Sequence, residues 1–243
     1  MADRSADQGV EQSPNRLLAG LPRAEYEKLR ARMEVIRPRQ QEVIYEQGRR
    51  LDYVYFPERG TISLLAVMAD GQPIEVGTVG NEGMVGLSVA LGTATSTHRA
   101  TCQIAGRTLR MPAAEFRAAV PPEHPLHEIV RRYADALMTQ IARSVACNRV
   151  HTAGQRLARW LLATHDRVAE DEFALTQEVI AQMLGVRRQT VSEVASEFQA
   201  AGLIGYRLGR VTIEDRAGLE RAACECYHAV RAHFDQALGM PRG

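Results

Sequence analysis

Two arginines, a glutamine and a threonine closely follow a glycine in the stretch LTQEVIAQMLGVRRQTVSEVASEFQAAGLI, residues 175–204. Arginine can form a bidentate hydrogen-bond pair with guanine, and glutamine can form one with adenine. A segment built only for packing has no need of such side chains at the start of a helix. The chemistry that this residue set offers is therefore recognition of the base edges of DNA.

The elements that must position these side chains are two amphipathic helices joined by a short turn. Thr176 can cap a helix that begins at Gln177, and Gly185 supplies the left-handed residue at which that helix ends. A second helix is predicted over residues 187–201, and Gly202 ends it. This is the geometry of a helix-turn-helix, whose second helix points its first residues into the major groove.

The segment after the second helix is basic. The sequence YRLGRVTI, residues 206–213, predicts a hairpin around Gly209 that rests on the DNA backbone like a wing. Any αα-corner with a glycine turn can imitate this pattern, and an Arg-Arg pair is usually a solvated face, but the polar row and the basic hairpin together favour DNA binding. The predicted DNA-contacting residues are Thr176, Gln177, Arg187, Arg188, Gln189, Thr190, Ser192, Arg207 and Arg210.

The composition limits what the rest of the chain can do. Its 243 residues carry a formal net charge of +1, so any positive patch must be local. No apolar run approaches the length that spans a bilayer, and the polar N-terminal stretch has no apolar signal region, so we expect no membrane partner. The chain contains neither a phosphate-cradling Gly-Lys loop nor a serine nucleophile elbow, and we expect no enzymatic activity.

The N-terminal part alternates in the manner of β-strands. Between about Leu21 and Met111, β-branched and aromatic residues lie between glycine, proline and aspartate breaks. Asp70-Gly71 between two apolar runs is a strong hairpin signal, because both residues tolerate positive φ. Strands at this spacing predict a small antiparallel roll or barrel, with a helix over about 21–32 before it and another over 112–120 after it.

A long helix is predicted from Pro125 to about Val150, where no further glycine or proline occurs. Apolar and small polar residues recur there at spacings of three and four. Such a stripe fits a helix that packs on its own sheet, and it equally fits a helix that pairs with its copy in a second chain. Periodicity alone leaves both interpretations open.

The sequence resembles the Crp/Fnr family of bacterial transcription regulators along nearly its whole length. The stretches VYFPERGTISLLAV and GNEGMVG resemble the cyclic-nucleotide-binding type of β-roll, and HPLHEIVRRYADALMTQIARSVACNRV falls where the family has its dimer helix. Residues 175–213 match the family's winged helix-turn-helix closely. The resemblance implies an α+β protein with an N-terminal antiparallel β-roll, a long dimerisation helix and a C-terminal winged helix-turn-helix.

The expected domains are a disordered tail over 1–18, the roll over 19–122, the dimerisation helix over 123–150 and the DNA-binding domain over 151–243. The resemblance implies a homodimeric, DNA-binding regulator that binds a pseudo-palindromic duplex, contacts RNA polymerase, and is controlled by its roll. The alternative is a signal-binding module that acts through protein contacts, with a degenerate helix-turn-helix. The residues expected in the dimer interface are Ile129, Tyr133, Ala136, Leu137, Gln140, Ile141 and Ser144.

The match also implies roles for single positions of the recognition helix. Arg188 stands at the family's guanine-reading arginine, and Gln189 stands where a glutamate often reads bases. Glu193 occupies a place that holds another base-contacting arginine in the cyclic-AMP-responsive members. The operator of this protein should therefore differ from theirs.

The residues that grip a cyclic nucleotide in this family are poorly matched. Nucleotide binders have a ribose-holding glutamate after a glycine, and here Leu87 follows Gly86. They also have an arginine followed by a small hydroxyl residue, whereas Ala100 follows Arg99, and the flanking strand aligns His98 with the arginine. We therefore expect that cyclic AMP is not the effector, and that these five residues are candidates for a pocket that takes another ligand or none.

Cofactor chemistry is also poorly supported. Iron–sulfur members of the family use an N-terminal cysteine cluster, and residues 1–101 contain no cysteine. His98, His124, His127 and His151 form no convincing haem-ligand pattern. We therefore expect neither an iron–sulfur cluster nor haem.

Four cysteines occur, too few and too unevenly spread for a disulfide framework, which suits a reducing cytoplasm. Cys224 and Cys226 form a CxC pair that could take a metal or sense oxidation, but the pair needs further ligands and only His228 is near. We expect an ordinary helix terminus and no metal site. Cys147 is the other candidate redox switch, and Cys102 is expected to be buried in a strand.

Overall fold

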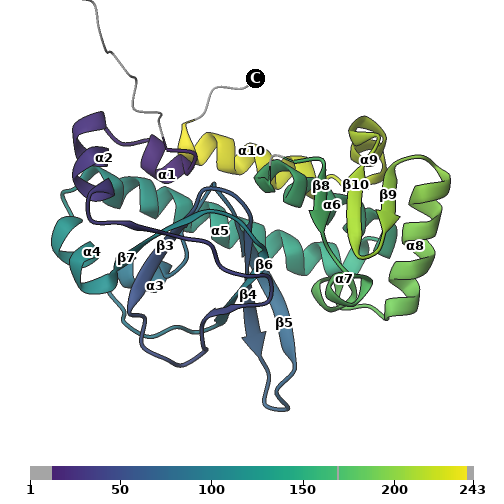
Figure 1. Ribbon diagram of the computed structural model, residues 1–243, viewed down its shortest axis with the longest axis horizontal. Helices are drawn as coiled ribbons and strands as arrows, with labels where there is room; N and C mark the ends of the chain where they lie inside the picture. Colours follow the sequence, from purple (N-terminus) through teal and green to yellow (C-terminus); the bar gives the residue numbers. More distant parts are fainter. Residues whose placement is uncertain (1–12, 169, 240–243) are drawn as a thin grey trace, which may run out of the picture.

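The computed structural model describes residues 13–168 and 170–239. Figure 1 shows a β-rich N-terminal body, a long helix that runs along it, and a smaller body at the other end that holds the helix-turn-helix. Within the described residues, no helix is both long enough and apolar enough to cross a bilayer. The order of antiparallel sheets, long helix and helix-turn-helix confirms the predicted fold class.

The N-terminal body is a roll of two antiparallel sheets. One sheet has the strand order β1-β7-β3 and the other β2-β6-β4-β5. The predicted Asp70-Gly71 hairpin joins β4 to β5, and Gly71 has a φ of 84°. The strands are β1 (Glu34–Ile36), β2 (Val43–Tyr45), β3 (Tyr53–Pro57), β4 (Thr61–Val67), β5 (Pro73–Val79), β6 (Arg99–Ile104) and β7 (Thr108–Pro112).

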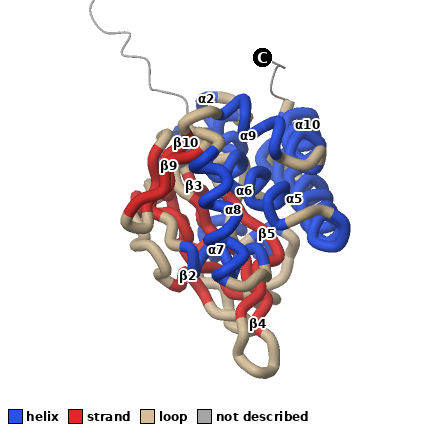
Figure 2. Tube along the Cα trace, turned by 90° about the vertical axis from the view of Figure 1, so that its right-hand side faces the viewer, coloured by secondary structure: helices blue, strands red, loops and turns tan. Residues whose placement is uncertain are grey.

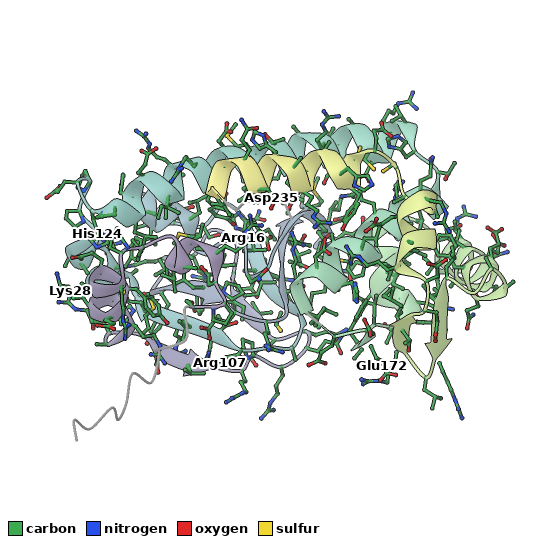
Figure 3. The ribbon with its side chains drawn as sticks, turned by 90° about the horizontal axis from the view of Figure 1, so that it is seen from above. Arg16, Lys28, Arg107, His124, Glu172 and Asp235 are labelled. Atoms are coloured by element: carbon green, nitrogen blue, oxygen red, sulfur yellow. The ribbon has the colours of Figure 1, made fainter. Side chains whose placement is uncertain are left out.

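Helices cover this roll, and the last of them comes from the C-terminal part of the chain. α10 lies alongside α5 (Figure 3), where Phe234 packs on Tyr133 with the ring centroids 6.3 Å apart. Near the end of α10, Asp235 forms an ion pair with Arg16 at 2.9 Å. The helices are α1 (Arg16–Ala19), α2 (Arg23–Arg30), α3 (Leu87–Ala90), α4 (Ala113–Ala119), α5 (Pro125–Val150) and α10 (Cys226–Leu238).

The prediction of a disordered tail over residues 1–18 is wrong at its C-terminal end, while residues 1–12 lie outside the described residues. Asn15 caps α1, because its side-chain oxygen accepts hydrogen bonds from two backbone N–H groups of that helix. Its side-chain amide donates to the carbonyl oxygen of Pro57 at 2.8 Å. The two leucines of α1 are fully buried. Tertiary contacts therefore order a segment that is too short to be a stable helix alone.

Five of the seven predicted dimer residues of α5 were assigned to the wrong partner, because the helix buries them against its own chain, whereas the other two, Ile141 and Ser144, are only partly buried. Tyr133 is fully buried and donates to the carbonyl oxygen of Met84 at 3.0 Å. Gln140 is 5% exposed and donates to the carbonyl oxygen of Thr78 at 2.9 Å. Ile129, Ala136 and Leu137 belong to the buried core of the roll, Ile141 packs against it, and Ser144 is partly exposed.

The opposite face of α5 is exposed. Met138 and Val145 are 71% and 69% exposed, and Ala142 lies between them at helical spacing. This outer stripe, Met138, Ala142 and Val145, is apolar and has no cover from the described part of the chain. The helical period revealed which residues of α5 are buried, but it could not tell whether a sheet of the same chain or a second chain buries them.

The second body has its own core around Trp160. Figure 2 shows α7 and α8 beside a small sheet, in which β10 pairs antiparallel with β9 on one side and β8 on the other. The predicted hairpin is confirmed, whereas β8 was not predicted. The elements are α6 (Ala153–Val168), β8 (Glu172–Ala174), α7 (Gln177–Leu184), α8 (Arg188–Ala200), β9 (Ile204–Arg207), β10 (Arg210–Ile213) and α9 (Arg216–Ala222).

A buried ion pair joins the two bodies. The Arg167 guanidinium on α6 donates to both carboxylate oxygens of Glu82, with Nη2 at 2.7 Å and Nε at 3.2 Å. It also donates to Gln140 Oε1 on α5 at 3.2 Å. The side chains of the pair are 9% and 8% exposed. Because removal of one partner would leave a buried charge unpaired, this contact fixes how the second body sits on the roll.

Candidate nucleic-acid interface

The turn of the helix-turn-helix is built as predicted. The Thr176 hydroxyl accepts a hydrogen bond from the backbone N–H of Val179 at 3.3 Å and so caps α7. Gly185 ends the helix in the left-handed region, with φ 61° and ψ 40°, where a side chain would be strained. Ala181 is buried between the two helices and its small side chain permits their close crossing.

The start of α8 presents polar groups to solvent. Arg187 is the N-cap residue, and its side chain makes no capping hydrogen bond to the described first turn. Arg187, Arg188 and Gln189 are exposed, while Thr190 and Ser192 are partly exposed. The other face of the helix is buried through Val191, Ala195 and Phe198. An uncapped helix N-terminus flanked by two arginines suits an anionic backbone beside base edges.

Gln189 has a partner within its own helix. Its side-chain amide donates to Glu193 Oε1 one turn later, at 3.0 Å. The two side chains therefore form a coupled pair at the centre of the exposed face. Arg188 has no ion-pair partner among the described residues. Arg187, the N-cap residue, likewise has no ion-pair partner within the described residues, so both arginines of the row are available to DNA.

The two predicted wing arginines differ in their surroundings. Arg210 forms an ion pair with Glu172 on the neighbouring strand β8. Arg207 is exposed beside Leu208, the residue at the tip, which is 91% exposed and has a φ of 51°. Within the described residues, Arg207 has no carboxylate partner. The positive charge of the wing therefore comes mainly from Arg207.

Tyr206 brings the separate parts of the predicted interface together. Its hydroxyl donates to the carbonyl oxygen of Leu175 at 3.0 Å, which ties the wing to the segment before α7. Burial raises the pKa of Tyr206, and the charge of Arg188 acts in the opposite direction. A Cβ on Gly209 would lie 3.4 Å from Thr176 Cγ2. The start of α7, the start of α8 and the wing thus meet on one side of the second body.

Inside the roll, the predicted effector residues are engaged with the protein. The Tyr45 hydroxyl and His98 Nε2 are hydrogen-bonded at 2.8 Å, and burial lowers the pKa of His98. Gly86 has a φ of 88° at the start of α3, and Leu87 packs against the core. Ala100 is fully buried opposite Tyr45. The structure therefore brings three of the five candidates, Gly86, His98 and Ala100, next to Tyr45.

Arg99, the fifth candidate, is placed differently. Its Nε donates to Glu46 Oε2 at 2.7 Å, and the side chain is 29% exposed. Arg99 also lines a cavity of about 200 Å³ together with Gln182 and Met183 of α7. The strand alternation therefore turns His98 toward Tyr45 and Arg99 toward the second body. This agrees with the alignment that puts His98 in the place of the family's phosphate-binding arginine.

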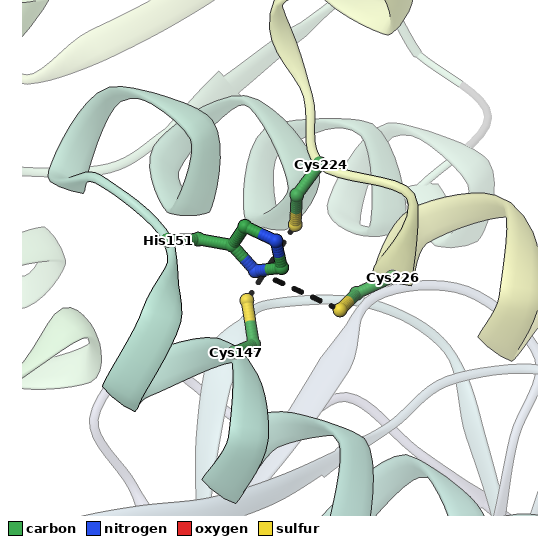
Figure 4. A group of neighbouring side chains, drawn as sticks. All are labelled: Cys147, His151, Cys224 and Cys226. Atoms are coloured by element: carbon green, nitrogen blue, oxygen red, sulfur yellow. Dashed lines mark hydrogen bonds between the residues drawn. The ribbon is translucent and has the colours of Figure 1, made fainter.

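A group of four side chains that the sequence analysis did not connect lies where α5 ends. Cys147, His151, Cys224 and Cys226 have their ligand atoms within 4.8 Å of one another (Figure 4). The premise that the CxC pair lacks further ligands is wrong, because Cys147 of α5 and the C-cap residue His151 supply two, and His228 is not one of them. Burial raises the pKa of the Cys224 and Cys226 thiols. The i, i+4 spacing of Cys147 and His151 was a signal in the sequence, since it puts both on one helix face.

A large groove separates the roll from the second body and α10. Its volume is about 1110 Å³, and charged and polar groups line it, among them Glu82, Arg159 and Arg167. Glu75 also lies on its wall, and burial raises the pKa of this carboxyl from 4.5 to about 7, although hydrogen bonds from Ser63 and the Trp160 indole act against that shift. The groove is therefore a junction between the two bodies with a titratable group in it.

Two family models match this chain. Residues 36–121 match the cyclic nucleotide-binding domain, and residues 155–222 match the Crp-like helix-turn-helix domain. The first match contains most of the roll and the second contains α7, α8 and the wing. A search of the curated proteins finds no significant match.

This chain is similar in fold to solved structures and matches them over nearly their whole length. FixK2 from Bradyrhizobium japonicum is 18% identical with a TM-score of 0.67, and 79% of this chain covers 98% of it. TTHB099, a CRP family transcriptional regulator from Thermus thermophilus, is 25% identical with a TM-score of 0.64, and 77% of this chain covers 96% of it. CLP of Xanthomonas campestris, a c-di-GMP responsive global regulator, is 15% identical with a TM-score of 0.61, and 80% of this chain covers all of it.

Proposed function

The chain belongs to the Crp/Fnr family of transcription regulators, and on that premise we propose that it is a homodimeric, sequence-specific DNA-binding regulator whose roll controls DNA binding. The observation that carries the proposal is the exposed, uncapped start of α8, with Arg187, Arg188 and Gln189 closely following the Gly185 turn. An exposed row of base-reading side chains at a recognition-helix N-terminus has no role in the packing of the second body.

The proposed division of labour follows from the surroundings of each residue. Arg188, exposed and without an ion-pair partner among the described residues, reads a guanine. Arg207 and the α8 N-terminus contact phosphates, which position the helix in the groove. The Gln189–Glu193 pair faces the bases as a unit, and its carboxylate can accept from a cytosine amino group.

The dimer interface is proposed on the outer face of α5. Met138, Ala142 and Val145 lie at helical spacing on the exposed side of a 26-residue helix. Isolated apolar residues on a surface need no explanation, but a stripe of them along one long helix is typical of a helix that pairs with its copy. A two-fold pair of α5 helices would allow two recognition helices to reach half-sites about 34 Å apart.

Control by the roll is proposed to act through the junction between the two bodies. The Arg167–Glu82 pair, Gln140 and the groove set the position of α6, and α6 leads to the helix-turn-helix. A ligand that favours one arrangement of this junction would shift the population that can bind both half-sites. The pairing of Tyr45 with His98 supports an effector other than cyclic AMP. Contact with RNA polymerase is proposed from the family alone.

Selection of bound duplexes from a random library tests this proposal directly. We expect an enriched sequence with two related half-sites whose centres are about ten base pairs apart, bound by a dimer in light scattering. Affinity for it should fall steeply with salt. Failure to enrich any sequence, with weak and uniform binding to all duplexes, would favour a module that acts through protein contacts.

A further inference from the structure

The cysteine–histidine group has the dimensions of a mononuclear metal site. Cys147 Sγ and Cys224 Sγ are 3.5 Å apart, and Cys226 Sγ lies 3.9 Å from His151 Nδ1. Four ligands at tetrahedral corners around one zinc ion, with Zn–S near 2.3 Å and Zn–N near 2.1 Å, are separated by roughly 3.5–3.8 Å. The observed spacing fits one ion. It is too small for the ligands of an iron–sulfur cluster, whose cysteines must span several metal ions.

The four ligand atoms converge from two directions. Cys147 and His151 come from the last turn of α5 and the residue after it, and Cys224 and Cys226 come from the link between α9 and α10 (Figure 4). The three cysteines are 0%, 2% and 3% exposed and form a small buried cluster of their own. The three thiols therefore belong to the protein interior and are not surface groups.

The histidine is oriented as a metal ligand. Its Nδ1 faces the sulfur atoms, while its Nε2 lies 3.2 Å from a carboxylate oxygen of Glu225. Metal-binding histidines usually donate their second ring N–H to a carboxylate, which fixes the tautomer and strengthens the ligand. Glu225 stands between the two cysteines of the CxC pair, so one short segment supplies two sulfur ligands and this supporting carboxylate.

The surroundings can balance the charge of such a site. A divalent ion with three thiolates and a neutral imidazole carries a net charge of −1, and its binding releases the three thiol protons. Arg156 and Arg159 of α6 are close enough to interact electrostatically with these cysteines. The Nε atoms of both arginines are buried and have no hydrogen-bond partner within the described residues. These are donors that thiolate sulfurs can use.

We propose that Cys147, His151, Cys224 and Cys226 form a closed tetrahedral site for a single thiophilic divalent ion of the zinc class. Three sulfurs and one imidazole nitrogen select such an ion over magnesium or calcium, which prefer oxygen ligands. With four protein ligands the site has no open position, so its role is structural rather than catalytic. The ion would tie the end of α5 to the start of α10.

A consequence for DNA binding rests on the proposed function. The site lies at the connection from α5 to α6, and the Arg156 guanidinium donates to the carbonyl oxygen of Leu184, directly before the Gly185 turn. The negative charge of the metal–thiolate group would attract the Arg156 guanidinium and fix its position. Through its hydrogen bond to Leu184, Arg156 would then fix the position of the end of α7. Loss of the ion should loosen the position of the recognition helix while the roll stays folded.

Metal content measures the proposal without reference to DNA. The full-length protein, purified under reducing conditions, should hold about one zinc ion per chain by elemental analysis and native mass spectrometry. Replacement of zinc by Co²⁺ should give the visible absorption of a tetrahedral ion together with a thiolate-to-metal band. The Cys147→Ser and Cys224→Ser variants should lose the ion, whereas Cys102→Ser, which removes a buried cysteine of the roll, should retain it.

Two further variants guard against misfolding as the cause of metal loss. Glu225→Gln changes an exposed side chain and should weaken zinc affinity by about 10- to 100-fold in a chelator competition, with an unchanged circular dichroism spectrum. His151→Ala should shift the Co²⁺ spectrum toward that of an open site. A metal-free protein that takes up no Co²⁺ when reduced, or a Cys147–Cys224 disulfide in the purified protein, would overturn the proposal.

The link to DNA is measured separately. Chelation should lower affinity for the selected operator about tenfold or more, and added zinc should restore it. If the protein binds zinc but its DNA affinity does not change on chelation, the metal site stands and the coupling fails. If zinc is bound and no operator exists, the proposed function fails and the metal site still stands.

Discussion

The start of α8 and the inside of the roll are the two regions that face ligands in this family, and they are built in opposite ways. At the start of α8, Arg187, Arg188 and Gln189 reach into solvent. Inside the roll, Tyr45 and His98 hydrogen-bond each other instead. The DNA-facing region thus keeps free donors, while the polar groups of the signal-facing region are engaged in internal contacts. The difference supports the proposal of a DNA-binding regulator whose effector is not cyclic AMP.

The largest expected effect concerns cyclic AMP and the inside of the roll. We expect no binding of cyclic AMP in the low micromolar range, because His98 replaces the phosphate-gripping arginine and Ala100 offers no hydroxyl group. A buried phosphate without its charge partner loses affinity by orders of magnitude. Calorimetry with cyclic AMP, and separately with cyclic di-GMP, makes the measurement. Low-micromolar binding of cyclic AMP that also raises operator affinity would show that cyclic AMP is the effector.

Substitutions in the outer stripe of α5 should have the next largest effect on operator binding. A Met138→Glu, Val145→Glu double variant should be monomeric and should lose operator affinity by about two orders of magnitude or more. In a dimer, binding of one subunit to its half-site holds the second subunit close to the other half-site, and a monomer loses this advantage. Met68→Glu is the matched control, since Met68 is 51% exposed in the roll and away from α5. Light scattering and anisotropy measure both quantities. A double variant that remains dimeric places the interface elsewhere.

The junction between the two regions should depend on pH through Glu75. Its pKa is raised from 4.5 to about 7, so the folded protein holds a proton that the unfolded chain releases in this range. This contribution to stability is present below about pH 4.5 and is lost as the pH rises through 7. Because Glu75 as a residue is only partly buried and lines the solvent-filled groove, screening reduces the effect, and we expect about 2 kcal/mol.

The Glu75→Gln variant isolates this contribution. Its free energy of unfolding relative to wild type should increase by about 2 kcal/mol between about pH 5 and about pH 8 in urea titrations. Glu115→Gln, a substitution on an exposed face of α4, is the control and should show no such trend. A Glu75→Gln difference that stays constant with pH would mean that this carboxyl is ionised in the folded protein.

Substitutions in the wing should change DNA binding least. Arg207→Ala should weaken binding to all duplexes and flatten the salt dependence by about one unit. Arg210→Ala should change the slope less, because Glu172 already neutralises that arginine. Anisotropy titrations at several salt concentrations distinguish the two variants. Equal slopes for both variants and wild type would remove the wing from the interface.

Sequence reasoning succeeded where the signals are local. Capping by Thr176, the left-handed Gly185 and the hairpin around Gly209 depend on neighbours within a few positions, and the structure confirms each of them. The DNA contacts themselves stay a prediction. The five buried residues of the predicted α5 interface were assigned to a second chain, because a buried stripe does not identify what buries it.

The cysteine–histidine group was missed for a different reason. Cys147 and Cys224 are separated by 77 positions, and their contact depends on the return of α10 along α5. From the sequence, only His228, the histidine nearest to the CxC pair, was considered as a further metal ligand. The i, i+4 pair at the end of α5 could have suggested a second half of the site, but the fold was needed to bring the two halves together.

The base preference at a single operator position is the sharpest measure of whether Arg188 reads a base. The affinities of wild type and Arg188→Ala should be measured on the selected operator and on all its single-base variants, with Arg59→Ala, an exposed arginine of the roll, as the control. Wild type should prefer guanine at one position of each half-site by about 1–3 kcal/mol, and Arg188→Ala should lose the preference at that position only. An equal loss on operator and random duplexes would contradict it, since Arg188 would then contact only phosphate.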